Sequence, residues 1–239
     1  MSDTAHKAVD VIAFDADDTL WHNESLFTVT QSKFKQLLSA YHSDEWIEEK
    51  LNETERRNIE HFGYGIKGFT LSMIETAIEL TEGRISGAEI GQIIGFAKAM
   101  RQAPVELLDG VEETISALAG QYTLMLITKG DLFDQESKIA RSGLGDYFNH
   151  VEIVSEKNAG VYRAVMAKHG FDPRRFLMVG NSIKSDILPA VEAGAHAVYV
   201  PYHTTWVHER VTEYDASGFF EIAHIGLLPA LLEEMSEEK

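Results

Sequence analysis

Short apolar runs rich in β-branched residues recur along the chain, and segments with helical periodicity separate them. Five runs predict strands: Val11–Phe14, Tyr122–Ile127, Val151–Val154, Phe176–Val179 and Ala197–Val200. Most of these runs are apolar at successive positions instead of alternating, which is typical of parallel strands covered by helices on both faces. The pattern therefore predicts a parallel sheet between two layers of helices.

Helical segments lie between or before the later strands. They are Val111–Leu118, Asp131–Arg141, Asn158–His169 and Ser185–Ala193. Asp109 and Glu112 form a pattern like a capping box at the start of the first helix, and a glycine follows each of the other three. The alternation of strand and helix predicts an α/β fold with a doubly wound parallel sheet. A last surface helix is expected over Gly226–Glu237.

The interval between the first two strands is unusually long. About a hundred residues separate Phe14 from Tyr122, far more than one crossover helix needs. The interval contains four helical patterns, Leu26–Tyr41, Asp44–Ile59, Phe69–Leu80 and Ile90–Arg101, the last preceded by a Ser86-x-x-Glu89 capping box. We therefore expect a sheet domain (residues 1–21 and 106–239) interrupted by an all-helical cap domain (residues 22–105).

Composition narrows the classes of function. The 239-residue chain is 44% hydrophobic, enough for one core and a second small one, and its 38 acidic against 21 basic residues give a net charge of −17. That sign argues against a nucleic-acid partner. The absence of cysteine excludes disulfides, thiolate metal sites and a cysteine nucleophile. Neither a signal peptide nor an apolar run of about 18 residues is present, so we expect a cytoplasmic protein without a membrane partner. Its oligomeric state stays open.

An acidic pair follows the first predicted strand. Asp15 and Asp17 lie two residues apart in Phe14-Asp15-Ala16-Asp17-Asp18-Thr19-Leu20. In open α/β sheets the ligand crevice lies beyond the carboxyl ends of the strands, so both carboxylates can face one site. Their mutual repulsion favours a hard divalent cation with oxygen ligands. An isolated Asp-x-Asp is nevertheless more often an ordinary solvated turn.

Three further polar turns follow later strands. Thr128 and Lys129 follow the second strand just before a helix, where unpaired amides can bind an anion. Lys157 follows the third strand, and Gly180-Asn181-Ser182-Ile183-Lys184-Ser185-Asp186 follows the fourth. Each turn alone would be unremarkable, but all four lie at the carboxyl ends of predicted strands. Together they predict a single site.

This series of turns resembles the four motifs of the haloacid dehalogenase superfamily, in order, over essentially the whole chain. The long helical insert matches that superfamily's cap between motifs one and two. The resemblance implies a phosphatase in which Asp15 is the nucleophile, Asp17 the general acid and base, and Lys157 the residue that balances charge. It also implies phosphate contacts from Thr128 and Lys129. Mg²⁺ would be held by Asp15, Asp17 and the turn carrying Asn181 and Asp186.

One position departs from the superfamily pattern. Many relatives have aspartate where this chain has Asn181. Asparagine keeps a carbonyl oxygen but removes a negative charge from the metal site, so Asp186 could take over coordination directly or through water. The affinity for Mg²⁺ is the property that this departure puts in doubt.

Other local features are weaker. Gly63-Tyr64-Gly65-Ile66-Lys67-Gly68 matches a dinucleotide fingerprint but follows no predicted strand, which favours a turn between helices or a cap loop in which Tyr64 or Lys67 touches substrate. His203 and His208 lie near Trp206 without a cluster of metal ligands, which favours packing or surface roles. His22 and Glu24 directly follow motif one and could contact substrate. Asp18 is expected to serve the local turn or to pair with a lysine.

Three alternative functions remain. A 2-haloacid dehalogenase would use Asp15 to attack carbon and would have no obvious task for Asp17. A receiver-type phosphoacceptor domain has no counterpart to the long helical insert. A non-catalytic binding protein with the same fold is the third, because Asn181 could reflect lost activity. We expect a small phosphorylated metabolite as substrate, since a cap that closes to exclude water suits small molecules.

Overall fold

The computed structural model describes residues 7–204, 206–211, 214 and 218–237 of the chain. These residues form two compact units. The sheet unit comprises residues 1–22, 105–129 and 139–239, and the helical unit comprises residues 23–104 and 130–138. The helical unit thus takes in a short segment after the second strand in addition to most of residues 22–105. The domain boundaries drawn from the sequence stay a prediction.

The sheet unit is built on six parallel strands in the order β3-β2-β1-β4-β5-β6. Their bounds are β1 Val11–Phe14, β2 Thr123–Lys129, β3 His150–Val154, β4 Phe176–Gly180, β5 His196–Tyr199 and β6 Phe220–Glu221. All five predicted strands are present, and β6 is an addition. The prediction of an α/β fold with a doubly wound parallel sheet is confirmed.

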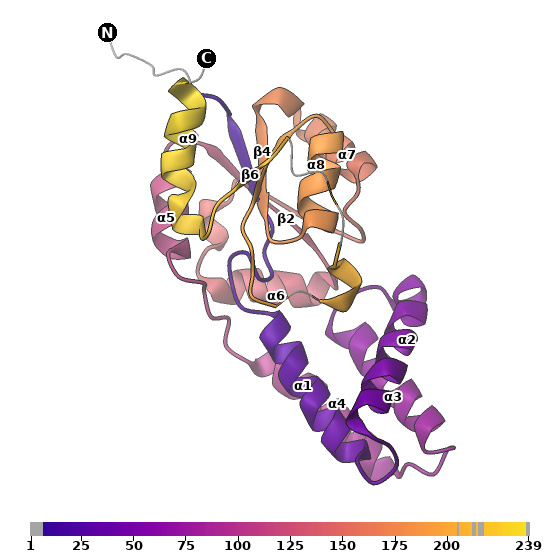
Figure 1. Ribbon diagram of the computed structural model, residues 1–239. Helices are drawn as coiled ribbons and strands as arrows, with labels where there is room; N and C mark the ends of the chain where they lie inside the picture. Colours follow the sequence, from indigo (N-terminus) through magenta and orange to yellow (C-terminus); the bar gives the residue numbers. More distant parts are fainter. Residues whose placement is uncertain (1–6, 205, 212–213, 215–217, 238–239) are drawn as a thin grey trace. The chain divides into compact units, whose positions relative to one another are not determined.

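Helices cover both faces of this sheet (Figure 1). The helices α5 (Val111–Ala119) and α9 (Leu228–Glu237) lie on one face, and α7 (Ala159–His169) and α8 (Leu188–Glu192) lie on the other. A short π-helix, Ile183–Ile187, precedes α8 directly. Helix α6 (Leu132–Ser142) begins in the helical unit and ends in the sheet unit.

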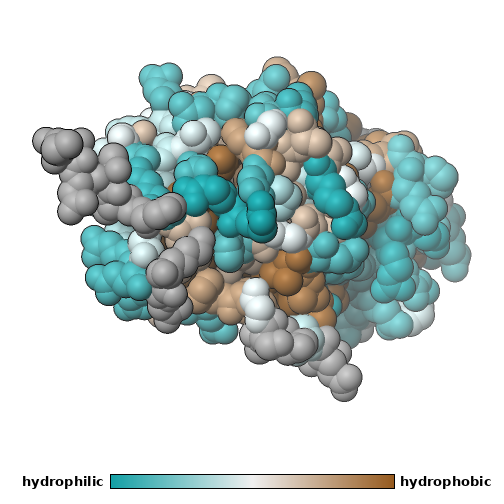
Figure 2. All heavy atoms as spheres, turned by 90° about the horizontal axis from the view of Figure 1, so that it is seen from above, coloured by the Kyte–Doolittle hydropathy of each residue, from teal (hydrophilic) through white to brown (hydrophobic). Residues whose placement is uncertain are grey.

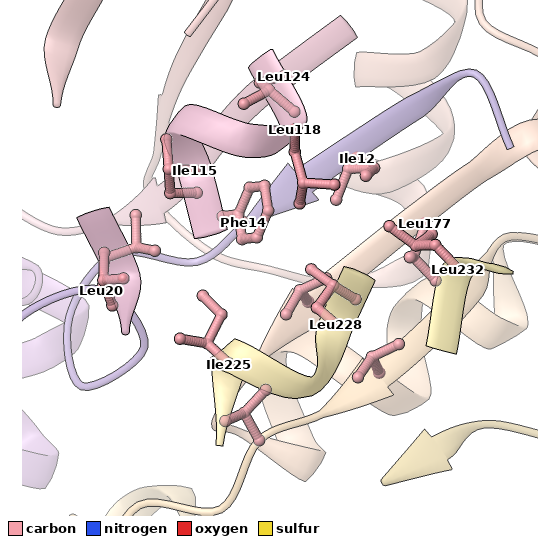
Figure 3. Packing of buried hydrophobic residues seen from close by; sticks show 14 of the residues in the cluster. Ile12, Phe14, Leu20, Ile115, Leu118, Leu124, Leu177, Ile225, Leu228 and Leu232 are labelled. Carbon is pink, nitrogen blue, oxygen red and sulfur yellow. The ribbon is translucent and has the colours of Figure 1, made fainter. Parts of the chain in front are cut away.

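Successive side chains of each strand enter opposite cores, as the two-residue period of a strand requires. Figure 3 shows one core, where Ile12 and Phe14 of β1 point toward Ile115 of α5 and Leu228 near the start of α9. The intervening residues of β1 pack in the second core against α7 and α8, together with residues such as Met125, Tyr162, Met166, Phe176 and Met178. Burial on both faces explains why the strands are apolar at successive positions.

The helical unit contains α1 (Glu24–Leu38), α2 (Asp44–Phe62), α3 (Ile66–Leu80) and α4 (Gly87–Gln102). It has a core of its own, which includes Phe34, Leu51, Met73 and Ile93. The predicted capping box at α4 is confirmed: the Ser86 hydroxyl accepts from the Glu89 amide, and the Glu89 carboxylate accepts from the Ser86 amide. Gly63 and Gly65 lie at the turn between α2 and α3, where both have positive φ.

The predicted cap of α5 is wrong. Helix α5 begins after Gly110, which adopts the left-handed conformation (φ +77°), and no side-chain capping bond is made there. A glycine tolerates this conformation because it lacks a Cβ, so the turn is closed by backbone geometry instead of by Asp109.

None of the helices in the described part of the chain is both long and apolar enough to cross a membrane. On the face shown in Figure 2, hydrophilic side chains surround smaller apolar areas.

Candidate active site

The carboxyl ends of β1, β2 and β4 meet at one edge of the sheet. The strand order reverses at β1, which lies between β2 and β4, and ligands of open α/β sheets bind at such a switch point. Phe14 is in register with Leu126 and with Val179, and the Asp15 amide donates to the Val179 carbonyl at 2.9 Å. Motif one at the end of β1 therefore lies between the ends of β2 and β4, which carry motifs two and four.

Asp15 is buried at the end of β1, with 7% of its surface exposed. Its Oδ2 accepts a hydrogen bond from the Thr19 hydroxyl at 3.1 Å. The intervening turn is closed by a bond from the Leu20 amide to the Ala16 carbonyl, and Asp18 adopts a left-handed conformation (φ +61°) within it. Asp18 thus serves the turn, as its position suggested.

Lys157 joins two carboxylates of the site. Its Nζ lies 2.5 Å from Asp15 Oδ1 and 2.7 Å from Asp186 Oδ1, and all three side chains are buried. Residues that are 142 and 29 positions apart in sequence are brought into one charged cluster. Because a buried charge is costly without a partner, this cluster accounts for how three charged groups remain inside the protein.

Burial and charge act against each other in this cluster. Burial raises the pKa of Asp15 to about 7; the Lys157 ammonium opposes that rise only in part, and the charge of Asp186 adds to it. Burial opposes the charged form of Lys157, but Asp15 and Asp186 together raise the pKa of its ammonium above the ordinary value. Lys157 is therefore a permanent cation beside the carboxylate of Asp15.

Asp17 is held by Trp21. The Trp21 indole Nε1 donates to Asp17 Oδ1 at 2.7 Å, and the indole itself is almost fully buried (1% exposed). An indole N–H can only donate, so a buried tryptophan needs an acceptor nearby. The bond fixes the direction of the second carboxylate of motif one.

A carboxylate oxygen and an amide oxygen, both possible ligands of a cation, lie close to the Thr19 hydroxyl. The Thr19 hydroxyl lies 3.1 Å from Asp15 Oδ2 and 3.1 Å from Asn181 Oδ1. A carboxylate and an amide oxygen this close to a common atom are the type of ligands that a hard divalent ion takes. Among the described residues no three Asp, Glu or His side chains are placed to hold a metal, so a cation here would need amide and backbone oxygens as well.

Asp186 has both carboxylate oxygens engaged. Oδ1 accepts from Lys157, and Oδ2 accepts from the Ser182 amide at 3.0 Å. Gly180 makes this approach possible, since a Cβ at that position would lie 2.3 Å from Asp186 Oδ2. Asp186 is thus paired with Lys157, whereas Asn181 Oδ1 lies near the Thr19 hydroxyl. The metal roles expected of Asn181 and Asp186 stay predictions.

Thr128 and Lys129 end β2. Thr128 is buried (1% exposed), and Lys129 donates to the Ser185 hydroxyl at 3.0 Å and pairs with Glu209. Glu209 comes from a short 3-10 helix, Val207–Glu209, after β5, and sequence reasoning did not find it. Burial raises the pKa of Glu209, but Lys129 and the two serines lower it by more.

The residues after motif one have local partners. His22 Nδ1 lies 2.7 Å from the Tyr202 hydroxyl, and the His22 amide donates to the Glu106 carbonyl at 3.0 Å. Glu24 is in the first turn of α1. His203 packs against the Tyr202 ring, and His208 packs edge-on against Trp206, which agrees with packing roles for these histidines.

The glycine-rich turn of the helical unit belongs to no nucleotide site of the Rossmann type, because it joins α2 to α3 and follows no strand. Lys67 pairs with Asp131 at 2.9 Å, and a Cβ at Gly65 would lie 3.4 Å from the Asp131 amide. Tyr64 is half-buried in this turn. The substrate contacts considered for Tyr64 and Lys67 stay predictions.

Comparison with known proteins supplies the family. The model of the haloacid dehalogenase-like hydrolases matches residues 9–194, more than half of the chain and all four strand-end motifs. The chain belongs to this family. The predicted superfamily and the prediction of an enzyme are thereby confirmed.

Individual relatives of this haloacid dehalogenase-like hydrolase agree with that assignment. A family hydrolase from Xanthomonas campestris has 39% sequence identity and a TM-score of 0.88, with 100% of this chain and 95% of that chain covered. The pyrimidine 5'-nucleotidase YjjG of Escherichia coli is 26% identical over 81% of this chain and 87% of its own length. A glyceraldehyde 3-phosphate phosphatase of Methanothermobacter thermautotrophicus is 34% identical over 46% of this chain and 51% of its own.

Proposed function

We propose that the chain is a Mg²⁺-dependent phosphohydrolase that cleaves a small phosphorylated metabolite through an aspartyl-phosphate on Asp15. The observation that carries the proposal is the pair of carboxylates on one turn, with Asp15 held by Lys157 and Asp17 held by Trp21. Asp15 lies beside the Lys157 ammonium, which opposes the rise in pKa caused by burial and so favours the ionised carboxylate that would attack phosphorus. Asp17 has the fixed orientation that proton transfer requires.

The proposed reaction has two steps. A carboxylate oxygen of Asp15 attacks phosphorus, the bond from phosphorus to the ester oxygen breaks, and Asp17 gives its proton to that oxygen. Water then attacks the phosphorus of the aspartyl-phosphate while Asp17 takes a proton from it. Inorganic phosphate leaves, and the Asp15 carboxylate is restored.

Other residues position the group that is transferred. Lys157 neutralises charge beside Asp15, and Thr128 with the amide of Lys129 would hold phosphate oxygens at the end of β2. Oxygens of Asp15 and Asn181 and the backbone carbonyl of Asp17 would hold the metal, with Asp186 taking part directly or through water. The bound metal would neutralise charge on the phosphoryl oxygens. Positioning and charge neutralisation supply most of the catalysis in phosphoryl transfer.

The dehalogenase alternative is disfavoured by Asp17. Attack on the carbon of a 2-haloacid needs no proton donor for the departing halide, yet the Asp17 carboxylate is oriented by a buried indole. The names of the similar proteins from Escherichia coli and Methanothermobacter thermautotrophicus, a nucleotidase and a phosphatase, support the same choice. A non-catalytic role would leave the buried cluster of Asp15, Lys157 and Asp186 without a chemical task.

The test is a panel of phosphorylated metabolites with and without Mg²⁺. Pyrimidine 5'-nucleotides come first, because the similarity to the nucleotidase extends over most of both chains. Glyceraldehyde 3-phosphate and sugar phosphates follow, and 2-chloropropionate tests the dehalogenase reaction. We expect Mg²⁺-dependent release of phosphate and a phosphorylated Asp15 peptide after rapid quenching. Release of chloride, or no release of phosphate from any compound, would refute the proposal.

A further inference from the structure

The ammonium group of Lys129 is largely shielded from solvent and is held by protein groups. Its ammonium contacts Glu209 Oε1, lies 3.0 Å from the Ser185 hydroxyl and 3.8 Å from Glu156 Oε1. Only 16% of the Lys129 side chain and 12% of the Glu209 side chain are exposed, so water screens this ion pair weakly. The pair joins the end of β2 to a segment 80 residues later in the chain.

The second oxygen of Glu209 binds the turn that follows β4. Glu209 Oε2 accepts from the Ser182 hydroxyl at 2.5 Å and from the Ser185 hydroxyl at 2.7 Å. These serines lie within the turn, between Asn181 and Asp186. The Ser182 hydroxyl also accepts from the Ser185 amide at 3.0 Å, so Glu209 is connected to the backbone of the turn.

One carboxylate therefore links motif two to motif four. We propose that Glu209 is a positioning residue of the active site, which holds the Lys129 side chain against the motif-four turn and thereby fixes the backbone of Thr128 and Lys129. The inference rests on the phosphohydrolase function proposed above. Glu209 acts through Lys129 and the two serines.

The geometry also gives Lys129 a role different from substrate binding by its ammonium. A cation held by a weakly screened carboxylate is largely neutralised, whereas the Lys129 amide remains part of the strand end next to Thr128. Lys129 therefore contributes its backbone to the phosphate site and its side chain to the link with Glu209. Anchoring of this kind matters because small displacements of binding groups slow catalysis strongly.

The experiment is a double-mutant cycle of Lys129→Met and Glu209→Gln. Glutamine keeps an acceptor for a serine but removes the charge. Glu209→Gln should lower kcat about tenfold or more and change KM by less than about threefold, since an ammonium that loses its carboxylate disturbs the strand end. In the Lys129→Met background the same change should lower kcat by less than about twofold, because the ammonium is already gone.

Two further variants sharpen the result. Glu209→Asp keeps the charge and should recover part of the kcat lost in Glu209→Gln. Glu156→Gln is the matched control, since Glu156 is a second carboxylate near Lys129 but is 47% exposed, and glutamine keeps an oxygen that can accept from the Lys157 amide. This control should leave kcat within about twofold of wild type, because exposed ion pairs contribute little. An unchanged kcat in Glu209→Gln, or equal losses in both backgrounds, would overturn the inference.

Urea denaturation of wild type, Lys129→Met, Glu209→Gln and the double variant separates this inference from the proposed function. Coupling between Lys129 and Glu209 should make the changes in denaturation midpoint non-additive, whether or not the protein hydrolyses a phosphate ester. Non-additive midpoints in a protein without phosphatase turnover would refute the function and keep the link. Additive midpoints and additive kcat losses in an active enzyme would refute the link alone. If Glu209→Gln does not fold, Glu209→Asp in the two Lys129 backgrounds gives the same comparison.

Discussion

Asp17 is the residue whose replacement separates the two proposed steps. In Asp17→Asn the amide oxygen still accepts from Trp21 Nε1, so the turn keeps its shape while the proton-transfer group is lost. With an activated phenyl phosphate, whose leaving group needs no proton, formation of the aspartyl-phosphate should slow by less than about tenfold. Hydrolysis of the intermediate should slow by about a hundredfold or more, because water still needs a base.

Rapid-quench kinetics measures both rates of this variant. The phosphorylated protein should accumulate in Asp17→Asn and not in wild type. Asp18→Asn is a suitable control, because Asp18 belongs to the same turn through its backbone. Equal rates for wild type and Asp17→Asn in the second step would remove Asp17 from the mechanism.

Asn181 gives a prediction about the metal. Asn181→Asp keeps an acceptor for the Thr19 hydroxyl and adds a negative charge beside Asp15. Mg²⁺ should bind about tenfold more tightly, which corresponds to about 1.4 kcal/mol and lies within the range expected for one charge near the surface. Calorimetric titration of Mg²⁺ and the Mg²⁺ dependence of turnover both measure this change.

The control for the added charge is Asn158→Asp. Asn158 caps α7 and is exposed, and aspartate is an equally good cap. The affinity for Mg²⁺ should stay within about twofold of wild type in this variant, because solvent screens the charge of an exposed side chain. A tighter site in Asn158→Asp as well, or an unchanged site in Asn181→Asp, would contradict the placement of the metal at Asn181.

The sequence was sufficient to predict some residues of the candidate site and not others. Asp15, Lys157 and Asp186 could be expected together, since each follows a strand with a strong apolar pattern, and the structure joins all three. Trp21 carried a usable signal, because a tryptophan that becomes buried needs an acceptor. Glu209 carried none, since a single glutamate in an irregular segment reveals nothing about a lysine 80 residues away.

At the level of elements, the end of β4 depends on Gly180. In Gly180→Ala the new Cβ would lie 2.3 Å from Asp186 Oδ2, so Asp186 must move away from Lys157. We expect a loss of kcat of about a hundredfold and a loss of unfolding free energy of about 2 kcal/mol, as for other breaks in buried charge networks. Urea denaturation and steady-state kinetics measure the two effects.

Gly120→Ala is the matched control for that substitution. Gly120 has a negative φ of −79°, and a Cβ there meets nothing within 4 Å. Its unfolding free energy should stay within about 1 kcal/mol of wild type, with kcat unchanged. If Gly180→Ala behaved in the same way, the close approach of Asp186 to β4 would not be needed for catalysis.

Helix α2 contains a buried carboxyl group, Glu55, whose ionisation lowers the stability of the folded protein. Glu55 on α2 is 6% exposed, its Oε2 has no hydrogen-bonding partner among the described residues, and burial raises its pKa to about 7. The folded state therefore binds this proton more tightly than the unfolded state does. Stability should fall as pH rises from about 4.5 to about 7, by up to about 3 kcal/mol.

Glu55→Gln removes this titration. Its unfolding free energy in urea should exceed that of wild type at pH 8. The difference should shrink as the pH falls and level off below about pH 4.5, where Glu55 becomes protonated in the unfolded as well as in the folded state. Glu60→Gln on the same helix is the control, since Glu60 is exposed. Parallel pH profiles for wild type and Glu55→Gln would show that Glu55 is ionised in the folded protein without penalty.

The helices and strands also show where local sequence patterns are sufficient to predict an element. Continuous apolar runs located β1 to β5 because parallel strands are buried on both faces. β6 was missed because Phe220–Glu221 is too short for any period, and it exists through pairing with β5. The cap predicted at Asp109 failed because Gly110 closes the turn by a backbone conformation that a side-chain pattern does not encode.

At the level of the whole molecule, the chain contains cores that do not share residues. The sheet unit has one core on each face of the sheet, and the helical unit has its own core around Phe34 and Met73. The chain leaves and re-enters the sheet unit through neighbouring segments, since the His22 amide donates to the Glu106 carbonyl and the Leu108 amide donates to the Leu20 carbonyl. Removal of the residues between these segments should therefore leave the sheet unit able to fold.

We predict that a variant in which a short Gly-Ser linker joins His22 to Val105 folds, hydrolyses a small activated phosphate ester and loses its preference among metabolites. The carboxylates, Lys157 and Thr128 stay within the sheet unit in this variant, so the chemical step keeps its residues. The preference should be lost because the helical insert is the part of the chain expected to exclude water and select the substrate.

Circular dichroism and amide hydrogen exchange report folding, and the ratio of kcat/KM values across the metabolite panel reports selectivity. The matched control joins the same segments in the Asp15→Asn background, which should fold equally well and hydrolyse nothing. A variant that folds and keeps the wild-type ranking of substrates would show that selectivity is built into the sheet unit.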